Sequence, residues 1–123
     1  MGDPETGEIG WYNPDPRTVI PLDRFRVSEP AARKLRTRRV PVTFDEAFGE
    51  VVDACAARPR TWITPAVKRA YAALHGRGLA HSAEAWSGGA LAGGVYGVRI
   101  GRAFMAESMF HRVTDAGMVA LAA

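Results

Sequence analysis

The spacing of apolar residues changes at Gly78, and this change constrains the fold more than any other feature of the sequence. Before Gly78 the apolar residues recur at helical spacing, and after it they alternate with a period of two, which is typical of strands. The alternating stretches are residues 79–86, 90–100 and 102–110. Only short glycine-containing segments separate them, which predicts tight turns and therefore an antiparallel strand meander. We predict an α/β (α+β) fold in which helices pack on this meander.

Two helices have clear start signals upstream of the strands. Ser28 is predicted to cap a short basic helix, with Pro30 in its first turn. Thr64 is predicted to cap a second helix, with Pro65 at the first helical position, where the missing N–H of proline costs nothing. Trp62 therefore lies outside this helix, in the loop that leads into it.

A third helix is predicted from a capping box of Thr43 and Glu46, in which each side chain satisfies a free backbone N–H of the other residue. Its apolar face would consist of Phe44, Phe48, Val51, Val52 and Cys55. Because Cys55 belongs to this stripe, we interpret it as a small core residue and not as a nucleophile. A fourth, apolar helix is predicted within residues 114–123.

The chain has 123 residues, which suits a single core, and we divide it into an N-terminal loop and basic segment (1–40) and a compact unit (41–123). Eight basic residues lie between Arg17 and Arg39, opposed by only two acidic ones. Such a segment attracts phosphates without sequence preference, although a solvated helix face would have the same composition. No apolar run is long enough to span a bilayer and the N-terminus resembles no secretory signal, so we expect a cytoplasmic protein.

The third alternating stretch carries the most unusual pattern. Strand alternation places Met105, Glu107 and Met109 on one face. Burying a lone carboxylate is costly, so Glu107 either faces solvent at a sheet edge or meets a cationic or hydrogen-bonding ligand in an apolar pocket. In the second stretch, three glycines in GGVYG (93–97) indicate either a bulge or the close approach of another backbone or a ligand.

The residue patterns typical of several kinds of functional site are absent from the sequence. His75, His81 and Glu84 do not have the spacing of metal ligands, and a single cysteine forms no disulfide framework. There is no catalytic order of serine, histidine and aspartate, no phosphate-binding loop and no dinucleotide glycine motif. The residues alone predict a binding site for a ligand that is anionic at one end and apolar at the other, without naming a reaction.

Four segments occur in a specific order: WYNPDPR, TWITPAVKRAYAALHGRGLAHSAEAW, LAGGVYGVRIGRAF, and ESMFHR with the DA and AL that follow it. Together, from about Trp11 to Leu121, they resemble the bacterial leucyl/phenylalanyl-tRNA–protein transferase family. The resemblance implies a partial GNAT-like acyltransferase fold. It also implies an enzyme that moves Leu or Phe from aminoacyl-tRNA to the N-terminal Arg or Lys of proteins, a step of the N-end rule degradation pathway. No cofactor or metal is implied, because the aminoacyl ester is already activated.

The resemblance also assigns residues to the two substrates. Trp62 matches a tryptophan that stacks on the terminal adenine of the tRNA, and Val95 matches the lining of the apolar pocket for the Leu or Phe side chain. The strand that lines the same site matches Phe104, Glu107, Ser108 and Met109. The residues suited to the tRNA acceptor stem are Arg33, Lys34, Arg36, Arg38 and Arg39. Glu107 would hold either the cationic acceptor or an amino group.

The sequence also departs from the family pattern. An N-terminal GIFPW segment and a C-terminal DCQ strand, whose Asp and Gln are implicated in activating the acceptor amine, have no counterpart here. Where the family has the motif ASK.AL (the point stands for any residue), residues 116–121 of this sequence read AGMVAL. Gly117 and Met118 therefore replace the Ser and Lys of the motif. We therefore leave the catalytic residues unassigned. We expect a chain that lacks N- and C-terminal parts of the family protein and is weakly active or inactive.

Two other functions compete with the transferase. One is a non-catalytic remnant that binds the aminoacyl end of tRNA. The other is an acyl-CoA-dependent acetyltransferase, which is disfavoured because no glycine-rich turn opens a helix for a pyrophosphate. For the transferase, the expected partners are tRNA charged with Leu or Phe and acceptor proteins with N-terminal Arg or Lys. No membrane partner is expected, and the chain is predicted to be a monomer.

Overall fold

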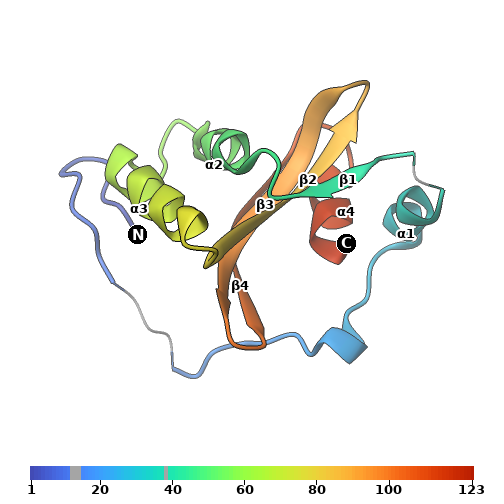
Figure 1. The fold of residues 1–123 in the computed structure, drawn as a ribbon, viewed down its shortest axis with the longest axis horizontal. Coiled ribbons are helices and arrows are strands. Elements are labelled where there is room, and N and C mark those ends of the chain that lie inside the picture. The colour runs from blue at the N-terminus through green and yellow to red at the C-terminus, as the bar shows by residue number, and fades with distance from the viewer. Residues whose placement is uncertain (12–14, 38) are drawn as a thin grey trace.

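The computed structural model describes residues 1–11, 15–37 and 39–123, and its centre is a four-stranded antiparallel sheet in the order β1-β2-β3-β4. The strands are β1 (Val42–Phe44), β2 (Ala80–Ser87), β3 (Ala90–Ile100) and β4 (Ala103–His111). The helices are α1 (Glu29–Arg36), α2 (Phe48–Ala56), α3 (Pro65–Gly76) and α4 (Ala116–Ala122), with a 3₁₀ turn η1 (Leu22–Arg24). Figure 1 shows α2 and α3 on one side of the sheet and α1 and α4 on the other.

The predicted meander is confirmed. β2, β3 and β4 follow one another in sequence and in the sheet, and each pair is antiparallel. Gly88, Gly89 and Gly101 in the two connections have positive φ, which glycine adopts without steric penalty. The helix starts at Ser28 and Thr64 are also confirmed, because each side chain accepts a hydrogen bond from the backbone N–H three residues later, at 3.4 Å. Among the described residues, no helix is long and apolar enough to cross a membrane.

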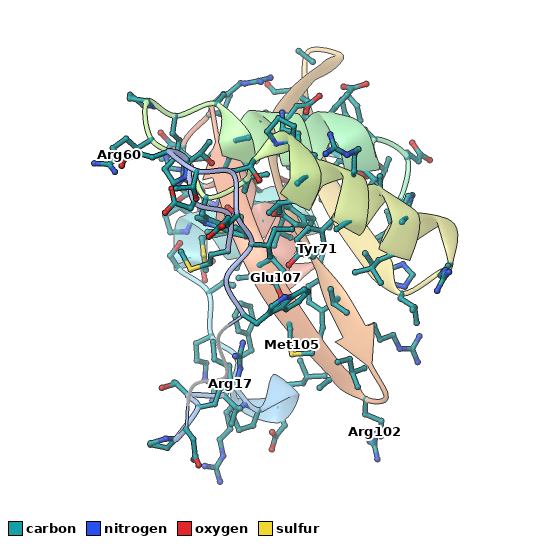
Figure 2. The ribbon with its side chains drawn as sticks, turned by 90° about the vertical axis from the view of Figure 1, so that its left-hand side faces the viewer. Arg17, Arg60, Tyr71, Arg102, Met105 and Glu107 are labelled. Carbon is teal, nitrogen blue, oxygen red and sulfur yellow. The ribbon has the colours of Figure 1, made fainter. Side chains whose placement is uncertain are left out.

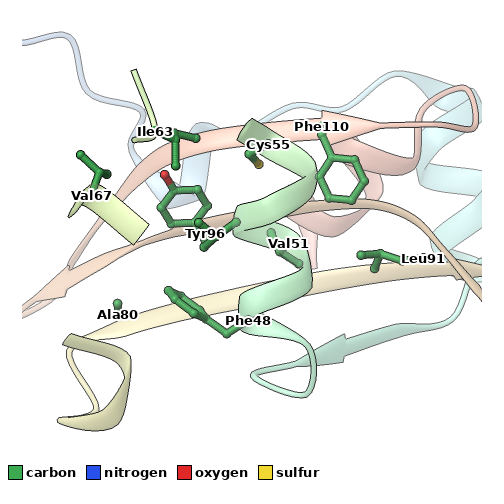
Figure 3. Packing of buried hydrophobic residues seen from close by; sticks show 10 residues of the cluster. Phe48, Val51, Cys55, Ile63, Val67, Ala80, Leu91, Tyr96 and Phe110 are labelled. Atoms are coloured by element: carbon green, nitrogen blue, oxygen red, sulfur yellow. The ribbon is translucent and has the colours of Figure 1, made fainter. Parts of the chain in front are cut away.

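The core between the sheet and the helices α2 and α3 is built from large side chains. Tyr96 of β3 lies at its centre, with its ring edge-on to those of Phe48 (5.9 Å) and Tyr71 (5.2 Å). Figure 3 shows Tyr96 and Phe48 together with Val51 and Cys55 of α2. Cys55 is 1 % exposed, which confirms its interpretation as a core residue. Burial raises the pKa of the Cys55 thiol, so it stays neutral.

The core on the opposite face is built from small side chains, which let α4 pack close to the sheet. Its buried members are Ala31, Val40, Ala83, Ala85, Ala92, Val95, Ala116, Val119 and Ala120. At Gly93 an added Cβ would lie 2.7 Å from the backbone of Ala116 and from the amide nitrogen of Gly117. Both alternatives left open for the GGVYG glycines occur: another backbone, that of α4, approaches closely at Gly93, and the pairing with β4 has a register shift between Tyr96 and Gly97.

The predicted capping box of Thr43 and Glu46 is wrong. Residues 42–44 form β1, which pairs with β2 so that Thr43 lies opposite Glu84, and the helix begins only at Phe48, without a side-chain cap. The hydroxyl of Thr43 donates to the Glu84 carboxylate at 2.7 Å. The Thr43 hydroxyl therefore bonds to a buried carboxylate that is distant in the sequence, and not to the helix end at which the local pattern placed it. The chain then turns through Asp45, which has φ +58°.

Candidate functional site

A cavity of about 350 Å³ opens on the face of the sheet that carries α4. Its apolar walls come from Phe44, Ala83, Val95, Phe104, Ala120 and Leu121. Val95 is almost fully buried, whereas Phe104 is 47 % exposed. Arg99 and the pair Asp45 and His81 add charged and polar groups to this lining. The cavity suits an apolar group whose polar end remains near charged side chains.

A β-bulge in β4 separates residues that the alternation pattern had placed on one face. Tyr96 pairs with Ser108 and the next residue of β3, Gly97, pairs with Ala106, so Glu107 is an extra residue without a partner on β3. Met109 consequently packs into the core beneath α4. Glu107 lies on the other side, beside α3 (Figure 2). The prediction that Glu107 and Met109 share a face is wrong, because a bulge adds one residue to the alternation.

Glu107 lies beside Tyr71 of α3, and the two side chains point toward each other in Figure 2. Burial raises the pKa of Tyr71, and the nearby Glu107 carboxylate raises it further. The Tyr71 hydroxyl therefore stays protonated at neutral pH and is available as a donor to the carboxylate. Glu107 itself is half-buried, at the edge between the core and solvent.

Trp62 lies in the loop before α3, half-buried, and packs against the core of α2 and α3. Its carbonyl accepts a hydrogen bond from the Gly2 N–H at 2.8 Å. An added Cβ at Gly2 would lie 2.5 Å from this carbonyl oxygen, so the N-terminal segment closely contacts the loop. Trp62 is thus held through its backbone and its contact with this core, and it lies outside the helix, as the sequence predicted.

The predicted site residues therefore fall into two groups on opposite faces of the sheet. Val95 and Phe104 line the cavity beneath α4, and Met109 packs nearby in the same core. Trp62 and Glu107 lie on the face of α2 and α3. β4 belongs to both groups, because successive residues of a strand face opposite sides of the sheet and the bulge at Glu107 shifts this alternation by one residue.

The basic residues assigned to tRNA lie on and after α1. Arg33 and Arg39 are exposed. Lys34 donates to the carbonyl of Thr114 at 2.7 Å, and Arg36 pairs with Glu29 at 2.5 Å on the surface. Arg38 lies outside the described residues.

Sequence reasoning missed a polar cluster where β1 turns into α2. The Asp45 carboxylate accepts from the Ser82 N–H at 2.9 Å and contacts Nδ1 of His81 at 2.8 Å, with Nδ1 of His75 3.8 Å away. Phe48 stacks on His75 with 4.2 Å between the ring centroids. Burial raises the pKa of Asp45, but the hydrogen bonds from His81 and Ser82 and the charges of the two histidines outweigh it, so the pKa is lowered. In the described part of the chain, no three His, Cys, Asp or Glu side chains are arranged to hold a metal ion.

Acid unfolding should reveal the Asp45 contacts. The folded pKa lies below the usual 3.8, so the stabilisation is complete above the unfolded pKa and is lost as the pH falls through the folded value. Asp45→Asn keeps a residue that tolerates positive φ. We expect it to unfold at a lower temperature than the parent chain near neutral pH, and the difference to vanish as the pH falls through the lowered folded pKa of Asp45. Thermal unfolding across this pH range measures the difference; a gap that stays constant with pH would contradict the assignment.

The fold and the site define a small α+β domain with an apolar cavity on one face of its four-stranded antiparallel sheet. The sequence model described as leucyl/phenylalanyl-tRNA protein transferase matches residues 19–123, and the chain belongs to this family. This finding confirms the resemblance seen in the sequence motifs.

Curated relatives with the same description support the assignment. A leucyl/phenylalanyl-tRNA–protein transferase from Salinibacter ruber is 53 % identical over 98 % of this chain and 54 % of its own length. One from Rhizorhabdus wittichii is 54 % identical over 94 % of this chain and 48 % of its own length. One from Akkermansia muciniphila is 50 % identical over 100 % of this chain and 66 % of its own length. The chain thus spans about half to two-thirds of the length of these relatives.

Proposed function

We propose that this chain serves the transfer of Leu or Phe from aminoacyl-tRNA to the N-terminal Arg or Lys of an acceptor protein, on a partial GNAT-like acyltransferase fold. The observation that carries the proposal is the apolar cavity at Val95 and Phe104, in a chain that belongs to a family described by this reaction. The acceptor proteins would thereby enter the N-end rule degradation pathway.

The cavity would receive the side chain of the transferred amino acid. Its volume of about 350 Å³ is large enough for a branched aliphatic or an aromatic side chain. Ala83 and Ala120 leave room where larger residues would fill the space, and Phe104 provides an aromatic wall. Apolar contacts of this kind favour Leu and Phe over polar side chains, because a polar group would lose its hydration without gaining a hydrogen bond.

Trp62 would bind the terminal adenine of the tRNA. A half-buried indole that packs against the core offers a rigid surface for stacking, and stacking of a base on an aromatic ring contributes about 1–3 kcal/mol. The exposed Arg33 and Arg39 would contact the tRNA backbone together with Lys34, Arg36 and Arg38. Such contacts carry no sequence preference and weaken as the salt concentration rises.

The transfer itself needs little more than orientation of the two substrates. The neutral amine of the acceptor attacks the ester carbonyl, a C–N bond forms, the ester C–O bond breaks, and the tRNA 3′-oxygen leaves with the proton that the amine gives up. Holding both substrates in place supplies most of the rate, because the ester is already activated. Glu107, on the edge strand β4, would hold an amino group of one of the two substrates, which suits a half-buried carboxylate next to a tyrosine hydroxyl.

The two binding roles can be separated by comparing charged and uncharged tRNA. We expect Trp62→Ala to weaken binding of leucyl-tRNA and of uncharged tRNA equally, by roughly 5- to 150-fold, since both carry the terminal adenine. Phe104→Ala should weaken only leucyl-tRNA, by about 10-fold, because only the charged form fills the cavity. Filter binding at fixed salt measures both effects.

Trp11→Ala is the matched control for Trp62, because Trp11 is 89 % exposed. The proposal fails if the parent chain binds charged and uncharged tRNA equally well, or if Phe104→Ala does not distinguish them. Transfer of labelled leucine to a protein that begins with Arg is measured in parallel. Selective binding without transfer would favour the alternative that the chain binds the aminoacyl end of tRNA without catalysis.

A further inference from the structure

The hydroxyl of Tyr96 is a buried polar group for which the proposed transfer reaction provides no role. Tyr96 is 0 % exposed, and within the described part of the chain its hydroxyl has no hydrogen-bond partner. Buried hydroxyls almost always have a partner, because an unpaired donor loses its hydration without compensation. A phenylalanine would fill the same space without this loss, so the presence of a tyrosine needs a reason.

Packing fixes the direction in which this hydroxyl points. The ring of Tyr96 is held edge-on against Tyr71 at 5.2 Å and against Phe48 at 5.9 Å. Figure 3 shows its oxygen at the end of the core where Ile63 lies, away from Phe48. Since the ring is enclosed by this cluster, any partner must reach the hydroxyl from that end of the core, where β4 and α3 meet.

The bulge in β4 brings a carboxylate to that place. Tyr96 pairs directly with Ser108, and the extra residue that precedes Ser108 is Glu107. Bulges commonly re-aim a side chain, and here the bulge turns Glu107 to the face that also carries Tyr71 and Tyr96. Figure 2 shows Tyr71 and Glu107 pointing toward each other, and the strand register and the 5.2 Å ring contact place Tyr96 beside Tyr71 on the same face. Two tyrosines and one half-buried carboxylate therefore share this edge of the core.

We propose that Tyr96 is a positioning residue for Glu107, whose carboxylate accepts from the Tyr96 hydroxyl as well as from the Tyr71 hydroxyl when its side chain turns inward. The two hydroxyls then offer the carboxylate a pair of donors that compensates for its partial burial and restricts its orientation. Under the proposed function, on which this last step rests, the restriction keeps Glu107 aimed at an amino group of a bound substrate.

The protonation states agree with this role. Burial raises the pKa of Tyr96, as it does for Tyr71. The Glu107 carboxylate adds to the rise at Tyr71, and at Tyr96 it adds less than Tyr71 and Cys55 do. Both hydroxyls are therefore protonated donors at neutral pH, while a carboxylate is the strongest acceptor available to them.

A double-mutant cycle with Tyr96→Phe and Glu107→Gln tests the coupling. If the hydroxyl serves Glu107, Tyr96→Phe lowers the unfolding temperature of the parent chain by about 3–5 °C and has less than half of this effect in the Glu107→Gln background. If the hydroxyl is merely an unpaired group, Tyr96→Phe leaves the unfolding temperature unchanged or raises it, equally in both backgrounds. Additive shifts therefore overturn the proposal.

A second readout reports on the hydroxyl itself. With tyrosines labelled at Cζ, the Tyr96 resonance, assigned through Tyr96→Phe, should shift in Glu107→Gln and stay in place in the control Glu50→Gln, which alters an exposed carboxylate on α2. An unmoved Tyr96 resonance in Glu107→Gln would also overturn the proposal. Neither measurement uses tRNA or transfer, so a failure here is distinguishable from a failure of the proposed function.

Discussion

Replacing Glu84 with alanine is expected to destabilise the folded chain by roughly 3–5 kcal/mol. Glu84 is 0 % exposed, and its carboxylate accepts from the hydroxyls of Thr43 (2.7 Å) and Ser82 (2.5 Å) and from the Ala47 N–H (3.2 Å). Thr43 in turn accepts from the indole N–H of Trp86 at 2.8 Å. The substitution leaves several buried donors unpaired and creates a cavity between β1, β2 and the start of α2. Urea unfolding measures the loss.

Glu46→Ala is the matched control for this experiment. Glu46 is exposed, and the capping box that the sequence pattern assigned to it does not form. Its replacement should therefore change the free energy of unfolding by no more than about 0.5 kcal/mol. A loss at Glu46 comparable to the loss at Glu84 would show that Glu46 does stabilise the helix start in solution.

Gly93→Ala should destabilise the chain by about 3 kcal/mol or more and should also impair the cavity. The new Cβ would lie 2.7 Å from the backbone of Ala116 and from the nitrogen of Gly117, and backbone atoms cannot move aside without moving α4. Because α4 supplies Ala120 and Leu121 to the cavity, its displacement should also reduce the preference for leucyl-tRNA over uncharged tRNA. Thermal unfolding and tRNA binding measure the two effects.

The same substitution at Gly49 should have the opposite effect on the stability of the chain. Gly49 lies in α2, and a Cβ there meets no atom within 4 Å. Alanine favours a helix over glycine, so this variant should be more stable by up to about 1 kcal/mol. Equal destabilisation at the two positions would mean that glycine flexibility, and not the contact with α4, explains the loss at Gly93.

Much of the fold could be predicted because its signals are local. The strands after Gly78 follow from alternation and glycine turns, and the helix starts at Ser28 and Thr64 follow from side chains that reach a backbone N–H three residues away. Thr43 carried the same local signal for a helix start, but its hydroxyl donates a hydrogen bond to a buried carboxylate 41 residues away. A capping pattern contains no information about a competing partner in another strand.

The candidate site was less predictable, because its geometry depends on pairing between strands. Val95 and Phe104 could be assigned through the family motifs, and the structure places both on one cavity. Glu107 was assigned to the same face as Met109, and the bulge places the two side chains on opposite faces. The alternation pattern assumes an unbroken register, and nothing in the residues of β4 marks where the extra residue is accommodated.

The sequence by itself determined the strand meander, two of the helix starts and the family of the chain, because periodicity, caps and ordered motifs are properties of neighbouring residues. Only the tertiary structure decided that Thr43 belongs to a strand, that Glu84 holds three segments together, and that Glu107 faces Tyr71. Each of these depends on a partner distant in the sequence, and a buried polar group takes whichever partner the packed chain brings within hydrogen-bonding distance.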